Sequence, residues 1–122
     1  MSFVDVESHH LELKMAALNY VFEQDKKLVL PVLMRNVHSP HWQMRAKSAQ
    51  LLGKIAHSST AMALEKMLHD EVWWVRIRAA EALLNLGELG ISLLTQQTKE
   101  HDRYAYDAAM SVLSNPIRIH HD

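Results

Sequence analysis

The sequence predicts an all-α solenoid in which short helical hairpins stack side by side. Two segments, residues 42–52 and 73–83, align without a gap at a spacing of 31 residues. Apolar residues recur three and four positions apart through most of the chain, as on one face of an α-helix. The 122 residues include only three Gly and three Pro, which leaves few positions for long irregular loops. A repeat of this length is typical of stacked units, because one unit cannot bury its apolar face alone.

A long leading helix is expected first, over residues 3–23 of a leading segment that covers residues 1–25. Its apolar side chains have helical spacing, at Leu11, Met15, Leu18 and Phe22. Charged residues 25–27 interrupt this pattern, and a second helix is expected over residues 28–37. Pro31 is compatible with that helix, because backbone N–H groups in the first turn have no partner within the helix.

The rest of the chain is expected to form three repeat regions and a tail, at residues 26–56, 60–86, 88–114 and 115–122. Ser39 and Pro40 predict a helix start, as the N-cap and the first helical residue, and this helix is expected to reach about Ala56. Another helix is expected over residues 61–69.

Two Asp residues and one Gly predict the remaining helix ends. Asp70 is expected to cap a helix over residues 71–86, and Gly87 to end it. A further helix is expected over residues 88–99. Asp102 is then expected to cap the last helix, residues 103–114.

The second aligned segment carries a motif that consists of Asp70, then Val75-Arg76-Ile77-Arg78-Ala79-Ala80-Glu81-Ala82-Leu83, then Leu86-Gly87. This pattern resembles the short HEAT repeat of phycobilin-lyase-like proteins, and the resemblance covers roughly residues 11–113. It implies one domain over residues 1–122, a right-handed α-solenoid of antiparallel helical hairpins with about three and a half HEAT-like repeats. It also implies a non-catalytic protein–protein interaction or scaffold module. The alternative it leaves open is an accessory or lyase-type subunit that assists chromophore attachment or modification of a partner protein.

Arg45 and Arg76 occupy equivalent positions in the two aligned segments. The resemblance implies that such an Arg holds neighbouring repeats together through carboxylates and loop carbonyls. Asp70 is the expected partner of Arg76, whereas Ser39 stands at the equivalent position before Arg45, so the pairing of Arg45 is expected to be weaker. The alternative role for both is to bind a phosphate or carboxylate.

Three Trp residues lie where one hairpin is expected to follow another. Trp42 and Trp73 are expected near each other along one edge of the stack. Trp is frequent at binding hot spots, but it is also a large side chain that fills cores. Two of the three are therefore expected to be packed, with Trp74 as the candidate for contact with a partner.

The resemblance implies that the second helix of each hairpin lines the concave side of the solenoid. A protein or peptide partner is then expected on the exposed strip of these helices, where Met side chains can adapt to it. The strip consists of Met34, Arg35, His38, Met62, Glu65, Lys66, His69, Ile91, Thr95 and Thr98. An ordinary solvated face is the alternative.

The charge and Cys content exclude several classes of partner and site. The formal net charge is −1, so no nucleic acid or membrane partner is expected. The basic residues of the first helices are expected on the convex side: Arg45, Lys47, Lys54, Arg76 and Arg78. The chain has no Cys, which excludes thiolate metal sites and suits a cytoplasmic protein.

No residue pattern predicts catalysis or a cofactor. The Ser residues lack a Gly-rich elbow, and none of the nine His is followed by Glu, as the ligands of a HEAT-like di-iron hydroxylase are. No metal site is therefore expected.

The leading helix is too apolar to form the outer end of a solenoid, whose terminal unit needs a polar outer face. Its apolar residues include Phe3, Val4, Val6 and Leu11. Three explanations are open: this segment folds back, two chains pair as a homodimer through a repeat end, or the array is longer.

Overall fold

The computed structural model describes residues 3–114, with side chains from His9 onward. Every regular element in this range is helical, which confirms the all-α prediction. The elements are α1 (Phe3–Gln24), α2 (Lys26–Asn36), α3 (Trp42–Ile55), a short 3-10 turn η1 (Ser58–Thr60), α4 (Ala61–Met67), α5 (Trp73–Leu84), α6 (Glu88–Gln97) and α7 (Arg103–Leu113). The predicted tail and the side chains of Phe3, Val4 and Val6 lie outside the described part.

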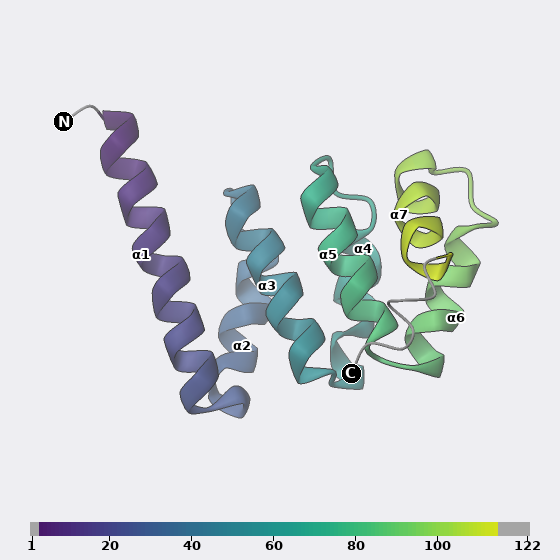
Figure 1. The fold of residues 1–122 in the computed structure, drawn as a ribbon, viewed down its shortest axis with the longest axis horizontal. Helices are drawn as coiled ribbons and strands as arrows, with labels where there is room; N and C mark the ends of the chain where they lie inside the picture. The colour runs from purple at the N-terminus through teal and green to yellow at the C-terminus, as the bar shows by residue number, and fades with distance from the viewer. Residues whose placement is uncertain (1–2, 115–122) are drawn as a thin grey trace.

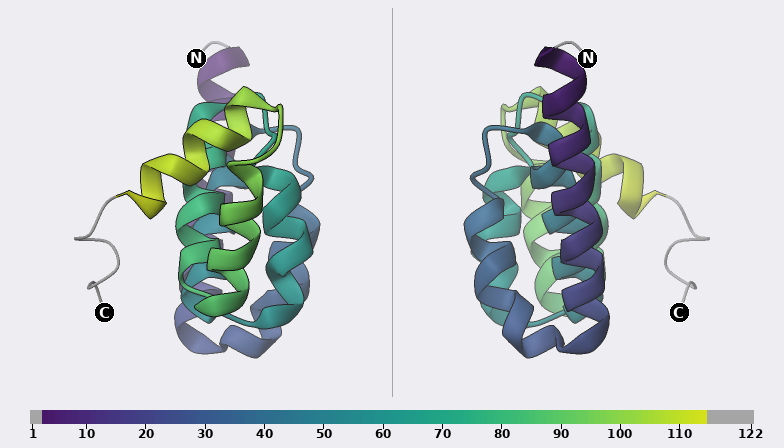
Figure 2. Two further views of the ribbon diagram at one scale, coloured as in Figure 1. Left: turned by 90° about the vertical axis from the view of Figure 1, so that its right-hand side faces the viewer. Right: turned by 90° about the vertical axis from the view of Figure 1, so that its left-hand side faces the viewer.

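The helices form two layers. In Figure 1, α1, α3, α5 and α7 follow one another across the molecule, and α2 and α4 lie behind them. We call α1, α3, α5 and α7 the front layer, and α2, α4 and α6 the rear layer. Figure 2 looks along the stack, with α1 and α2 at one end and α6 and α7 at the other. Each predicted repeat region thus contains one rear and one front helix.

Three of the predicted helix starts are wrong by two residues, and two of these helices, α3 and α5, begin later than expected. Helix α3 begins at Trp42, because the Ser39 hydroxyl accepts the N–H of His41 (3.1 Å) in the turn before the helix. Helix α5 begins at Trp73, because a carboxylate oxygen of Asp70 accepts the N–H of Val72 (2.9 Å). Ser39 and Asp70 therefore organise the turns that precede the helices and do not cap the helices themselves.

Two Asp side chains do cap helices. Asp102 accepts the N–H groups of Tyr104 (2.8 Å) and Ala105 (3.4 Å) at the start of α7, as predicted. Asp25 accepts the N–H groups of Lys27 and Leu28, so α2 begins at Lys26, two residues earlier than expected. An N-cap of this kind stabilises a helix by about 1 kcal/mol.

One apolar core runs through all seven α-helices. Its larger side chains are almost completely excluded from water: Phe22, Val29, Leu33, Leu51, Leu52, Leu64, Leu68, Val75, Leu83, Leu94 and Val112. Burial of each such side chain contributes roughly 1.5–3 kcal/mol. The fold is thus held mainly by contacts between successive helices, as expected for stacked repeats.

Helices α3, α5 and α7 of the front layer are packed more closely than the helices of the rear layer. The contact between α3 and α5 is the most extensive in the described chain, and that between α5 and α7 follows, whereas α4 and α6 touch much less. Small residues allow this approach: a Cβ atom on Gly53 would lie 2.8 Å from the Cα of Ala82. The buried front-layer side chains include Ala46, Ala49, Ala79, Ala80, Ala82, Ala105, Ala108 and Ala109.

Candidate functional site

Two adjoining hollows lie on the front layer. The first has a volume of about 350 Å³ and is lined from α1, α3 and α5 by Met15, Trp42, Gln43, Ala46, Lys47, Gln50, Trp74 and Arg78. We call it the Trp groove. The second has a volume of about 780 Å³ and shares Gln50 and Arg78 with the first. Lys47, Lys54 and Arg78, which were expected on the convex side, line these hollows. The hollows are local, and which layer of the stack is concave stays a prediction.

The Trp side chains are arranged differently from the prediction. Trp42, Trp73 and Trp74 are 38%, 47% and 51% exposed, so the expectation that two of them would be packed is wrong. Trp42 shares the groove with Trp74, and not with its repeat equivalent Trp73. The Trp74 ring meets the Trp73 ring edge to face, with centroids 5.1 Å apart. Two exposed indoles from neighbouring helices thus border one hollow.

Positive charge lines the same groove. Lys47 and Arg78 are repeat equivalents on α3 and α5. Burial lowers the pKa of the Lys47 ammonium, and the positive charges of Lys54 and Arg78 lower it further. Its Nζ donates to the side-chain oxygen of Gln50 (3.4 Å). The guanidinium of Arg78 lies 5.5 Å from the ring centre of Trp74 and donates to a carboxylate oxygen of Glu81 (2.8 Å).

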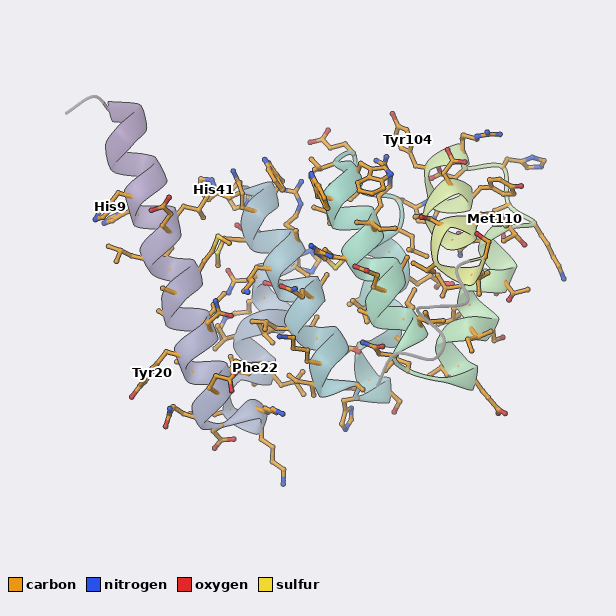
Figure 3. The ribbon with its side chains drawn as sticks, viewed as in Figure 1. His9, Tyr20, Phe22, His41, Tyr104 and Met110 are labelled. Carbon is orange, nitrogen blue, oxygen red and sulfur yellow. The ribbon has the colours of Figure 1, made fainter. Side chains whose placement is uncertain are left out.

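The second hollow has a mixed lining. The ammonium groups of Lys26 and Lys54 lie 5.4 Å and 6.0 Å from the ring centre of Phe22, whose place near the end of α1 is labelled in Figure 3. The carboxylates of Glu23 and Glu81 line the same hollow. Acidic and basic groups therefore meet here, whereas Lys47 and Arg78 are the charged residues that line the Trp groove.

A comparison with protein-family models identifies the repeats. A model described as HEAT repeats matches residues 24–114, which is well over half of the chain. The chain belongs to the HEAT-repeat family. HEAT repeats generally mediate protein–protein interactions. A search of curated proteins found no match, and the resemblance to the phycobilin-lyase-like subfamily stays a prediction.

The predicted Arg residues of the HEAT repeats lie between neighbouring units, but with different partners. Arg45 binds the Asp70 carboxylate with two N–H groups, Nε at 2.8 Å and Nη2 at 3.1 Å, and donates to the carbonyl of Ser39 (3.0 Å). Arg76 donates to the backbone carbonyl of Asp70 (2.8 Å), and its guanidinium lies 4.0 Å from the ring centre of Tyr104. Asp70 is thus a partner of Arg76 through its backbone carbonyl, whereas its carboxylate pairs with Arg45. The expectation that Arg45 would be paired more weakly is wrong, because Arg45 reaches forward to the next repeat.

Sequence reasoning missed a second contact between HEAT repeats. The Nδ1 atom of His69, after α4, forms a hydrogen bond with the carboxylate of Asp102, before α7. This hydrogen bond is the main cause that lowers the pKa of Asp102, and the N–H groups of Tyr104 and Ala105 lower it further. The sequence signalled the cap formed by Asp102, but its spacing gave no indication that His69 would lie beside it.

Some side chains of the predicted rear strip form hydrogen bonds or packing contacts within the chain, and others are exposed to solvent. Glu65 accepts from the amide of Gln97 (3.3 Å), His69 binds Asp102, and the hydroxyl of Thr95 donates to the carbonyl of Ile91 (2.7 Å). Thr98 likewise donates to Thr95, and Met34 packs partly against the core. The exposed residues of the strip include Arg35, His38, Met62 and Lys66. His38 and Lys66 also line a hollow of about 250 Å³.

Metal binding and membrane insertion are two other roles to set against the described residues. Among them, no group of three His, Asp or Glu side chains could hold a metal ion. None of the helices that the structure describes is both long and apolar enough to cross a membrane.

Proposed function

We propose that the chain is a non-catalytic HEAT-repeat module that binds a protein or peptide partner on its front layer. The observation that carries this proposal is the Trp groove, where two exposed indoles from successive repeats border one hollow. Trp is among the residues that contribute most to protein–protein binding, especially beside a pocket.

The packing of the two layers supports the choice of the front layer. A two-layer stack bends toward the layer whose helices lie closer together, and the closer helices are α3, α5 and α7. We therefore propose a single-domain, right-handed solenoid of antiparallel hairpins whose front layer is concave. A concave surface of this kind is the usual binding surface of helical solenoids.

Selection of peptides from a displayed random library tests this function. The immobilised chain is expected to enrich a set of related peptides, and these are expected to lose affinity for the variant with Trp42→Ala and Trp74→Ala. The matched control carries Met62→Ala on α4, an exposed residue of the rear strip. Loss of binding in the control alone would assign the partner to the predicted rear strip, and no enrichment would contradict the proposed function.

Pairing of two chains through the first repeat is a second proposal, favoured by the outer side of α1. Leu13 and Tyr20 are 54% and 68% exposed there, and Figure 3 shows Tyr20 directed away from the stack. Light scattering over a concentration series tests it, since a constant monomer mass would contradict it. The alternative function, an accessory role in chromophore attachment, predicts that an added tetrapyrrole changes its absorbance when it is mixed with the chain. An unchanged spectrum would contradict that role.

A further inference from the structure

The Trp groove contains a small apolar site, which we call the apolar seat. Met15 on α1 and Ala46 on α3 line it together with the rings of Trp42 and Trp74. Its volume of about 350 Å³ is near the lower end of ligand pockets, which span about 300–1,000 Å³. This seat can therefore take one large apolar side chain more readily than a whole helix.

The charge beside this seat is positive and only partly neutralised. Lys47 takes part in none of the ion pairs among the described residues, and its polar contact is the uncharged amide of Gln50. Lys54 and Arg78 are close enough for their positive charges to disfavour the charged form of Lys47. An anion bound at Lys47 would relieve this repulsion.

We propose that the Trp groove binds an acidic peptide segment, with an apolar side chain between Trp42 and Trp74 and a neighbouring carboxylate on Lys47 and Arg78. This inference rests on the proposed function and names the chemical class of its partner. Arg78 is already oriented by Glu81 and by the Trp74 ring, so little side-chain entropy is lost when it donates to the carboxylate of the peptide.

The surroundings favour a peptide over a single-stranded nucleic acid. Exposed aromatic rings beside cations also suit nucleic acid bases and phosphates. However, the hollow that continues from the groove mixes Glu23 and Glu81 with Lys26, Lys54 and Arg78, so the front layer offers no continuous basic track for a phosphate backbone. A short acidic segment needs only the two cations at the groove itself.

NMR titration of the ¹⁵N-labelled chain tests the inference, with the indole N–H signals of the three Trp residues as reporters. The probes are three peptides with blocked ends: Leu residues flanked by Asp, the same peptide with Asn for Asp, and the same peptide with Lys for Asp. Oligothymidylate is the fourth probe. The Asp peptide is expected to shift the Trp42 and Trp74 signals and to bind about fivefold more tightly than the Asn peptide.

Matched variants separate the charge from the apolar seat. Lys47→Gln is expected to weaken the Asp peptide about fivefold and to leave the Asn peptide unchanged. Lys66→Gln removes the same charge from the exposed side of α4 and is expected to change neither. Trp74→Ala is expected to weaken both peptides roughly thirtyfold.

The outcomes distinguish this inference from the proposed function. Equal affinity for the Asp and Asn peptides, or tighter binding of oligothymidylate, would overturn the acidic specificity. So would the absence of indole shifts with the Asp peptide at millimolar concentration. In each case, library peptides that bind through Trp42 and Trp74 would still support the proposed function, and their absence would remove it as well.

Discussion

Replacement of Asp70 by Ala is expected to destabilise the stack strongly. The Asp70 carboxylate accepts two N–H groups of Arg45 and the backbone N–H of Val72. The side chains of Arg45 and Asp70 are only 15% and 13% exposed, so the change leaves a largely buried guanidinium without its counter-charge. Such a loss costs about 3–5 kcal/mol, and the remaining access of water to Arg45 favours about 3 kcal/mol.

Thermal and denaturant unfolding followed by circular dichroism measure this loss. For a chain of this size, about 3 kcal/mol corresponds to a decrease in Tm of roughly 12 °C. The matched control is Asp107→Ala, which also removes an Asp from an ion pair with Arg. Arg103 and Asp107 are 79% and 50% exposed, so the expected loss is below about 0.5 kcal/mol.

A double variant checks the cause of the effect. Arg45→Leu removes the guanidinium, so adding it to Asp70→Ala is expected to recover part of the lost stability, because no unpaired buried charge remains. If Asp70→Ala and Asp107→Ala differed by less than about 1 kcal/mol, our account of the contact between repeats would be refuted.

Three further substitutions and one change of pH have definite expected results. Gly90→Ala is expected to destabilise by more than about 3 kcal/mol, since its Cβ would lie 1.5 Å from the carbonyl oxygen of Leu83; a stable variant would contradict this packing. Gly87→Ala meets no neighbouring atom and is expected to cost only about 1–2 kcal/mol for its φ of +72°, which chemical denaturation can resolve. The pKa of Asp102 is lowered in the folded chain, so its stabilising contribution is present above the pKa of the unfolded chain and decreases as the pH falls toward the folded value. Asp102→Asn is expected to reduce the loss of stability on acidification, and an unchanged pH profile would contradict that role.

The repeat spacing predicted much of the fold because each repeat buries a similar set of residues. It placed the helices that became α3 and α5, and the resemblance to HEAT repeats implied that Arg45 and Arg76 lie between units. Spacing alone could not show the direction in which a long Arg side chain reaches. For that reason, the prediction paired Asp70 with Arg76 alone and missed the bond between its carboxylate and Arg45, one repeat earlier.

The candidate site could be predicted only in part. We predicted the rear strip because the resemblance implied that the helices that became α2, α4 and α6 line the concave side. The sequence also held a signal that favours the front layer. Buried Ala residues are concentrated on α3, α5 and α7, and such small residues mark the helices that approach most closely. The position of Trp74 in the groove depends on one step along α5, about 100° around the helix axis, which repeat alignment with Trp42 cannot resolve.

In the proposed mode of binding, stability and recognition depend on different sides of the same helices. Arg45 and Lys47 are two residues apart on α3, as are Arg76 and Arg78 on α5, so the members of each pair point about 200° apart. The first of each pair binds at the junction between repeats, and the second lines the Trp groove. Changes at Lys47 or Arg78 should therefore alter the choice of partner with little effect on the free energy of unfolding. Changes at Arg45 or Asp70 should weaken binding only by weakening the stack.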